Sequence, residues 1–197
     1  MVSKQGQNSA NLSRRGYVAL GSNLKTATRT SLQMVNEALE LFAGAAIRIS
    51  QQSQWHSAPA FPVGSGPDYV NGVVEIESEM EAVAVLAALH DIESALGRTR
   101  PKRWAARVVD VDLLAFGAEI APNRAEFVRW AELPLALQMQ KAPEGLILPH
   151  PRLQDRAFVL KPWAEIAPEW RHPVLGRTVS EMLAALPMAA RDEIRPL

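Results

Sequence analysis

The residues best suited to chemistry lie in one short stretch, where a run of cations precedes two aspartates. Five of the 21 basic residues fall within ten positions, with no acid among them: Arg98, Arg100, Lys102, Arg103 and Arg107. Asp110 and Asp112 follow, separated by one valine in an otherwise apolar stretch. Because side chains alternate along a strand, both carboxylates are predicted on one face.

Two carboxylates on one strand face repel each other unless a cation neutralises them. Mg²⁺ suits such a pair, since it prefers oxygen ligands and completes its shell with water and substrate phosphates. Arginines grip phosphate oxygens with charge-assisted hydrogen bonds. The pattern therefore predicts a site for a metal-bound polyphosphate. The alternative is a solvated basic loop whose arginines pair with the aspartates.

Phosphate loops built from backbone amides are missing from the sequence. Neither GxxxxGK[ST] nor GxGxxG occurs in the 197 residues, so a P-loop and a Rossmann site are excluded. Side chains must then bind the phosphates.

The elements that position these residues follow from apolar periodicity. Strands are predicted near 17–20, 47–55, 70–76 and 108–116, and helices at 30–44 and 81–96. We expect the third strand to have one buried face and the fourth to be central in the sheet. The prolines and glycines of 57–67 predict a loop. This order is the split βαβ pattern of a ferredoxin-like α+β fold.

The remaining segments predict one domain at 17–197. Residues 1–16 are polar and predict a disordered leader, whereas 118–145 predicts an inserted helical or irregular lid. Helices are expected at 157–166 and 178–186. With 21 basic and 21 acidic residues the charge is balanced, so we expect no binding of nucleic acid or of an anionic membrane. The absence of cysteine excludes a disulfide framework and a thiolate zinc site. Because no stretch resembles a signal h-region or a membrane helix, we expect a cytoplasmic protein.

A family resemblance is carried by five blocks in the family's order. They are 19–24 (ALGSNL), 67–71 (PDYVN), 97–100 (GRTR), 103–114 (RWAARVVDVDLL) and 148–158 (LPHPRLQDRAF). Together they resemble the 6-hydroxymethyl-7,8-dihydropterin pyrophosphokinases over about residues 17–188. The resemblance implies a ferredoxin-like enzyme of folate biosynthesis that transfers pyrophosphate from ATP to the hydroxymethyl group of the pterin and releases AMP.

The resemblance also implies roles for individual residues. Asp110 and Asp112 would hold two Mg²⁺ ions, with Asp110 near the attacking hydroxyl and Arg98 and Arg107 on the phosphates. The implied ATP-binding residues are Glu93, Arg98, Arg100, Trp104, Arg107, His150 and Arg156. The implied pterin-binding residues are Ser57, Ala58, Ala60, Tyr69, Asn71, Trp104, Asp110 and Phe158.

The sequence departs from the family pattern at three points. Ala105-Ala106 replaces a usual Gly-Pro, and Ile147 stands where a threonine is common. The third departure is the insertion between Gly117 and Gly145, close in sequence to the nucleotide-binding blocks. Two alternatives remain open: a ferredoxin-like nucleic-acid-binding module, and a catalytically silent nucleotide-binding relative. ATP and the pterin are the expected partners of a monomer.

Overall fold

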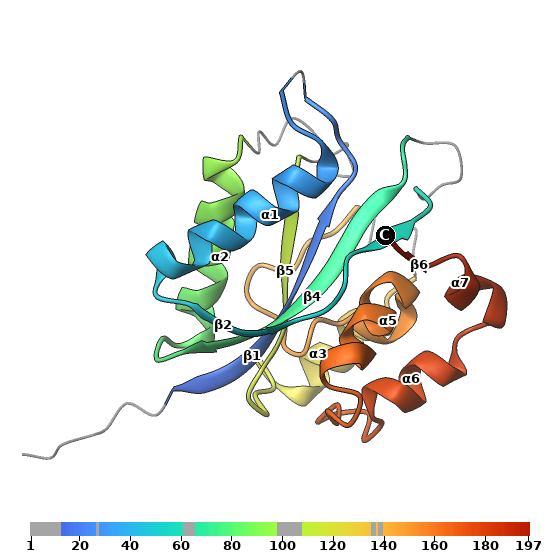
Figure 1. Cartoon of the computed structure of the whole chain (residues 1–197). Coiled ribbons are helices and arrows are strands. Elements are labelled where there is room, and N and C mark those ends of the chain that lie inside the picture. Colours follow the sequence, from blue (N-terminus) through green and yellow to red (C-terminus); the bar gives the residue numbers. More distant parts are fainter. Residues whose placement is uncertain (1–12, 27, 61–65, 98–107, 135–136, 138–139) are drawn as a thin grey trace, which may run out of the picture.

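The computed structural model describes residues 13–26, 28–60, 66–97, 108–134, 137 and 140–197 (Figure 1). Its strands are β1 (Arg14–Ser22), β2 (Arg48–Gln52), β3 (His56–Ala58), β4 (Tyr69–Ser78), β5 (Asp110–Phe116) and β6 (Arg195–Pro196). Its helices are α1 (Ser31–Phe42), α2 (Ala82–Ala95), α3 (Arg124–Ala131), α5 (Ala157–Ile166), α6 (Val179–Ala185) and α7 (Met188–Asp192).

The strands form one antiparallel sheet in the order β5-β1-β4-β3-β6, with β2 also paired to β4. β1 lies between β4 and β5, which confirms the predicted ferredoxin-like arrangement. β5 was predicted to be central, but no described strand pairs with its outer edge. Its apolar sequence instead reflects burial by helices on both sides of the sheet.

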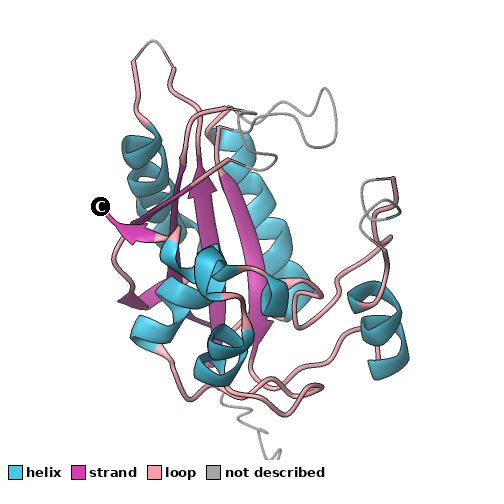
Figure 2. Cartoon of the chain, turned by 90° about the vertical axis from the view of Figure 1, so that its right-hand side faces the viewer, coloured by secondary structure: helices cyan, strands magenta, loops and turns pink. Residues whose placement is uncertain are grey.

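Helices cover both faces of the sheet (Figures 1 and 2). α1 and α2 pack on one face against side chains such as Val18, Val74 and Leu113. α5 and α6 pack on the other face, where Trp163 contacts the cluster around Tyr17. β4 is consequently buried on both faces, so the prediction of a single buried face was wrong.

Glu75 shows how the second layer changes the environment of β4. This carboxylate is only 3% exposed, although its place in the strand predicted solvent. It accepts hydrogen bonds from the Tyr17 hydroxyl (2.9 Å) and the Ser50 hydroxyl (2.8 Å), and Arg15 lies 3.4 Å away. Burial, together with the hydrogen bond to Glu75, raises the pKa of Tyr17 to about 12. The buried carboxyl group is tolerated there because each of its oxygens accepts a hydrogen bond.

The predicted helix boundaries are confirmed by capping groups. The Thr30 side chain accepts from the Gln33 amide and so begins α1, and Thr178 begins α6 in the same way with Glu181. α2 ends before Gly97, whose φ of +91° favours glycine. α5 occupies the predicted range 157–166.

Both ends of the domain differ from the prediction at particular residues. Arg14, Arg15 and Gly16 were assigned to the leader but form the start of β1, whereas residues 1–12 lie outside the described part. Ser57 and Ala58 were assigned to a loop but belong to β3, because β4 offers them a hydrogen-bonding partner. No helix among the described residues is long and apolar enough to cross a membrane.

The insertion at 118–145 packs against the C-terminal part of the chain. It contains α3, whose Phe127 and Trp130 form a small core with Ile147 and Val174. The ring of Phe127 lies 5.1 Å from that of His172, which is fully buried. The His172 Nδ1 atom accepts hydrogen bonds from the amides of Val174 and Leu175. This histidine therefore joins the insertion to the tail as a neutral group.

The pH dependence of stability should reveal this neutral histidine. Burial lowers the pKa of His172 to about 4, below the ordinary value of about 6.5 that applies in the unfolded chain. The unfolded state then binds more protons between these values, so the free energy of unfolding falls as the pH drops from about 6.5 to about 4. His172→Asn keeps an acceptor but cannot titrate. Urea denaturation at pH 7 and pH 4 should show a loss smaller by roughly 1–3 kcal/mol in this variant; equal losses would contradict the assignment.

Candidate active site

A row of residues crosses four strands on the face covered by α5. Gly21 of β1 lies opposite Asp110 of β5 and also opposite Asn71 of β4, and Asn71 in turn lies opposite His56 of β3. Directly opposed residues project from the same face of a sheet. Asp112 lies opposite Ala19, two residues along, and shares this face. The predicted co-facial aspartates are thus confirmed.

Gly21 leaves a space in the middle of this row. A Cβ atom at position 21 would lie 3.0 Å from Oδ1 of Asn71. Asn71 is 6% exposed, and its Nδ2 group is buried without a hydrogen-bond partner among the described residues. A buried, unpaired donor is costly, so its presence favours a ligand acceptor at this position.

Asp112 is connected to the first turn of α5. The guanidinium of Arg156 lies 3.4 Å from Oδ2 of Asp112 and stacks over the ring of Phe158 at 5.7 Å. Phe158 is 38% exposed, which is unusual for a large aromatic residue within a packed layer. The predicted ATP-binding arginine and the predicted pterin-stacking ring therefore lie beside one of the two aspartates.

Glu93 holds the strand that carries the aspartates. Its side chain is 2% exposed, and Oε1 accepts a hydrogen bond of 2.8 Å from the amide of Val111, which separates Asp110 from Asp112. Ser22 provides a second contact, since its hydroxyl donates a hydrogen bond to the carbonyl of Val108, just before β5. Glu93 was predicted to bind ATP. Its described contact is with the β5 backbone, a role that periodicity could not reveal.

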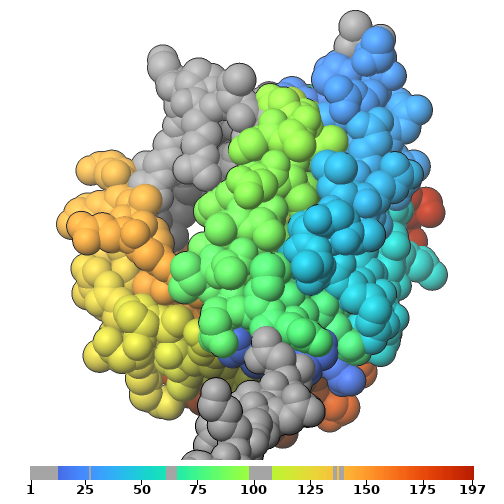
Figure 3. Space-filling model, turned by 90° about the vertical axis from the view of Figure 1, so that its left-hand side faces the viewer, coloured from blue at the N-terminus to red at the C-terminus, as the bar shows by residue number. Residues whose placement is uncertain are grey.

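A cleft of about 590 Å³ opens beside Asp112, between α2 and the end of the insertion (Figure 3). Val83, Leu86 and Ala87 supply an apolar wall from α2. The polar side chains of the lining are His90, Asp112, Lys141, Glu144, His150, Arg152 and Arg156. Lys141 and Arg152 were not predicted, because nothing in their local sequence connects them with Asp112.

His150 takes part in this cleft as a neutral acceptor. Its amide donates to the Leu114 carbonyl (2.8 Å), and its Nδ1 accepts from the Arg152 amide (3.1 Å). Burial and the positive charge of Arg156 lower the pKa of His150 to about 3. A neutral imidazole adds no further charge next to Arg156.

The predicted loop residues reach the other end of the row. Ala58 lies opposite Tyr69, so both share the face of Asn71, and Ala58 packs against Ala157 of α5. Ala60 is also buried, at 5% exposed. Ser57 projects from the opposite face, where its hydroxyl lies 3.5 Å from Asp68.

Four predicted site residues lie outside the described part of the chain: Arg98, Arg100, Trp104 and Arg107. The described residues that flank them are Gly97, at the end of α2, and Val108, held by Ser22. The basic segment at 98–107 therefore lies in the sequence between α2, which lines the cleft, and Asp110 at the start of β5. Ile147, one of the departures from the family pattern, is buried against α3, whereas Ala105 and Ala106 lie outside the described residues.

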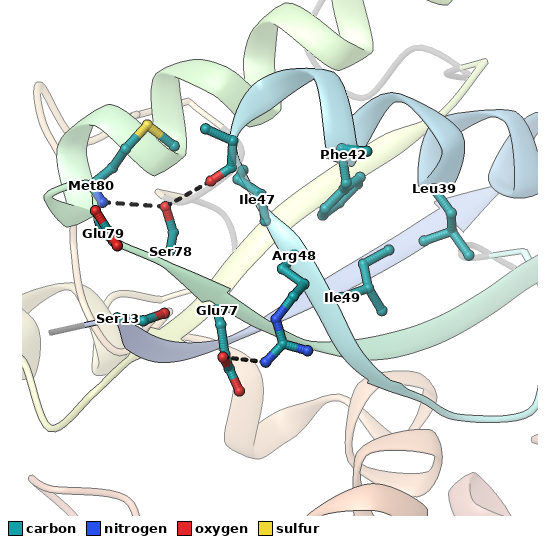
Figure 4. A pocket seen from close by; sticks show the side chains of 12 residues that line it. Ser13, Leu39, Phe42, Ile47, Arg48, Ile49, Glu77, Ser78, Glu79 and Met80 are labelled. Atoms are coloured by element: carbon teal, nitrogen blue, oxygen red, sulfur yellow. Dashed lines mark hydrogen bonds and ion pairs between the residues drawn. The ribbon is translucent and has the colours of Figure 1, made fainter.

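A second pocket lies at the far end of β4, away from the row (Figure 4). Its lining is mainly apolar, with Leu39, Phe42 and Ile49 among the side chains, and its Arg48 is paired with Glu77. It contains none of the predicted site residues.

The arrangement joins two chemically different subsites. Asp112 lines a cleft that also contains Lys141, Arg152 and Arg156, and Asp110 lies two residues away on the same face of β5. Across Gly21, Asn71 offers a buried amide on the same face of the sheet, and α5, which covers this face, carries the exposed ring of Phe158. An amide and an aromatic face are the groups that suit a flat polar heterocycle.

Comparisons with known proteins agree with this geometry. Residues 17–168 match the family described as 7,8-dihydro-6-hydroxymethylpterin-pyrophosphokinase. A 2-amino-4-hydroxy-6-hydroxymethyldihydropteridine pyrophosphokinase of Pseudomonas aeruginosa is 35% identical, covering 91% of this chain and 96% of the relative. The enzyme of the same name from Synechocystis sp. is 32% identical, covering 91% and 80%.

Solved structures support the fold. Two crystal structures of Plasmodium falciparum HPPK-DHPS, one of them the wild type, match with TM-scores of 0.63 and 0.62. Each is 14% identical and covers 90% of this chain. The chain spans 46% and 42% of those longer proteins.

Two substitutions of Glu93 should distinguish the effect of its hydrogen bond to the β5 backbone from the effect of its charge. Glu93→Gln retains an oxygen acceptor for the Val111 amide, whereas Glu93→Ala leaves that amide buried and unpaired. We expect Glu93→Ala to lower the free energy of unfolding by about 1–3 kcal/mol more than Glu93→Gln. Urea denaturation monitored by circular dichroism measures the difference. Equal stabilities would show that the contact with Val111 does not hold the strand.

Proposed function

The chain belongs to the 7,8-dihydro-6-hydroxymethylpterin-pyrophosphokinase family, and we propose that it transfers the pyrophosphoryl group of ATP to 6-hydroxymethyl-7,8-dihydropterin. The hydroxymethyl oxygen attacks the β-phosphorus, the bond from that phosphorus to the α,β-bridging oxygen breaks, and AMP leaves. The observation that carries the proposal is the row Asp110, Gly21 and Asn71 on one face of the sheet. Family membership favours this activity over the nucleic-acid-binding alternative.

The proposed phosphate subsite is the end of the row nearest the cleft. Asp110 and Asp112 share a face and are half-buried, and the two carboxylates fit Mg²⁺. Among the described residues no group of three or more acidic, histidine or cysteine side chains could hold a metal, so phosphate oxygens and water would complete the shell. Bound Mg²⁺, in two copies as proposed, would neutralise charge on the attacking and leaving oxygens.

The cations of the cleft position the triphosphate in this proposal. Arg156 lies 3.4 Å from Asp112, within reach of a phosphate oxygen in the cleft. His150, neutral because its pKa is about 3, offers hydrogen bonding without repelling this arginine or a bound cation. Arg98 and Arg107, by resemblance, add phosphate contacts from the basic segment. Catalysis then rests on positioning and charge stabilisation.

The proposed pterin subsite is the end of the row formed by β3 and β4. The unpaired Nδ2 group of Asn71 donates to an acceptor on the ring edge. The missing side chain of Gly21 leaves room for the ring to extend toward Asp110. Ala58, Ala60 and the exposed Phe158 supply apolar surface for its faces. Two strand spacings, about 10 Å, separate Asn71 from Asp110, a span that suits a two-ring heterocycle with its hydroxymethyl group.

Asp110 has the proposed role nearest the reacting atoms. Its carboxylate accepts a hydrogen bond from the attacking hydroxyl and so orients the oxygen toward the β-phosphorus. As the new oxygen–phosphorus bond forms, the hydroxyl proton passes along this hydrogen bond to the Asp110 carboxylate and from there to solvent, while AMP leaves with the α,β-bridging oxygen. Because Glu93 and Ser22 hold the β5 backbone, this carboxylate is positioned before the substrate binds.

Removal of either carboxylate charge tests the phosphate subsite. Asp110→Asn and Asp112→Asn preserve shape but remove the negative charge, so we expect AMP formation to fall at least about 10²-fold while the protein remains folded. Asp91→Asn, on the exposed side of α2, is the matched control and should retain full activity. Near-normal turnover by either site variant would contradict the assignment, and so would an Mg²⁺-independent wild type.

Filling the space at Gly21 tests the pterin subsite. The added methyl group of Gly21→Ala would lie 3.0 Å from Oδ1 of Asn71 and occupy space assigned to the ring. We expect the KM for the pterin to rise about 10-fold, with the KM for ATP nearly unchanged. Gly44→Ala is the control, since nothing lies within 4 Å of its added Cβ. An unchanged pterin KM would place the heterocycle elsewhere.

A further inference from the structure

His56 lies beneath the proposed pterin subsite, where its ring contacts Glu165 and Gln54. The residue is 1% exposed, and its Nε2 lies 3.1 Å from Oε1 of Glu165 on α5. Its Nδ1 lies 3.1 Å from the carbonyl oxygen of Gln54. The other carboxylate oxygen of Glu165 accepts a 2.8 Å hydrogen bond from the Gln54 amide. Strand β3 is thereby joined to α5 through both side-chain and backbone groups.

Both ring nitrogens of His56 face oxygen acceptors. Nδ1 lies against the carbonyl oxygen of Gln54 and Nε2 against a carboxylate oxygen of Glu165, so each ring nitrogen has an oxygen neighbour at 3.1 Å. The ring therefore has no nitrogen left for a ligand, and its burial keeps it away from the cleft. Any effect of His56 on the reaction must act through the residues that it positions.

Those residues are the ones assigned to the pterin. Asn71 lies directly opposite His56, and Ala58 follows two residues later on the same face. On the α5 side, Phe158 and Glu165 are seven residues apart, a spacing that places both on one side of the helix. Ala58 packs against Ala157 beside Phe158. The apolar contact at Ala58 and the polar contact at His56 are thus two separate attachments between β3 and α5.

We propose that His56 and Glu165 form a positioning pair, which sets the separation between the β3–β4 wall of the pterin subsite and the Phe158 ring. One attachment alone would let β3 pivot on α5, whereas two attachments define its orientation. The pair lies three strands away from Asp110 and Asp112 on β5, so we expect its loss to displace the β3–β4 wall and to leave the two aspartates in place. This inference rests on the pterin subsite proposed above.

The test compares the two substrates in variants of the pair. Glu165→Gln and His56→Gln alter the contact between the imidazole and the carboxylate, and we expect each to raise the pterin KM about 10-fold, which corresponds to about 1.4 kcal/mol. The ATP KM should stay within about twofold. The double variant should resemble the single ones, because the second substitution removes nothing further. Glu169→Gln, an exposed glutamate just beyond α5, is the control and should change neither constant.

Other outcomes overturn the inference. An unchanged pterin KM in an active, folded Glu165→Gln variant would do so, as would equal increases in both KM values or additive effects in the double variant. Glu165 is 34% exposed, so its variant decides the matter even if His56→Gln does not fold. Wild-type protein that forms no AMP would instead contradict the proposed function.

Discussion

The register at which β1 pairs with its two neighbours is the constraint on which the site depends. Gly21 lies opposite Asp110 on one side and opposite Asn71 on the other. A slip of one residue in either pairing would turn an entire set of side chains to the other face of the sheet. Val111 and Leu113 would then leave the core beneath α2, and both aspartates would enter it. The apolar packing that stabilises the sheet therefore also specifies the site.

The two helical layers have different tasks. α1 and α2 bury the apolar face of β1, β4 and β5, and α2 additionally supplies Glu93, which holds the β5 backbone. α5 covers the opposite face, but its first turn carries Arg156 and Phe158 to the open end of the sheet. Stability thus comes from the middle of the sheet and chemistry from its end.

Local patterns predicted the parts of the fold that depend on local physics. The helices followed from apolar spacing and capping residues, and the co-facial aspartates followed from strand alternation. β3 was missed because its three residues lie beside a segment rich in proline and glycine, and only pairing with β4 makes them a strand. The edge position of β5 was missed because an apolar sequence reports burial by helices and says nothing of the number of neighbouring strands.

The residues of the candidate site also fall into two groups, those that the sequence indicated and those that only the structure reveals. The types and spacing of Asp110 and Asp112 indicated their chemistry, and the resemblance to a family indicated Asn71, Arg156 and Phe158. The roles of Glu93 and His56 could not be predicted, because each depends on a contact between distant segments. His56 in particular looked like an isolated histidine, and only the approach of Glu165 from α5 gives it a partner. Contacts of this kind carry no local signal in the sequence.

The most direct test of the account is identification of the nucleotide product. Wild-type protein incubated with ATP, Mg²⁺ and 6-hydroxymethyl-7,8-dihydropterin should be analysed by phosphorus NMR as the reaction proceeds. Attack at the β-phosphorus predicts AMP and a pterin diphosphate in equal amounts, with no ADP. Formation of ADP would show attack at the γ-phosphorus, and persistence of both substrates would show that the site does not perform this transfer; either result would contradict the account.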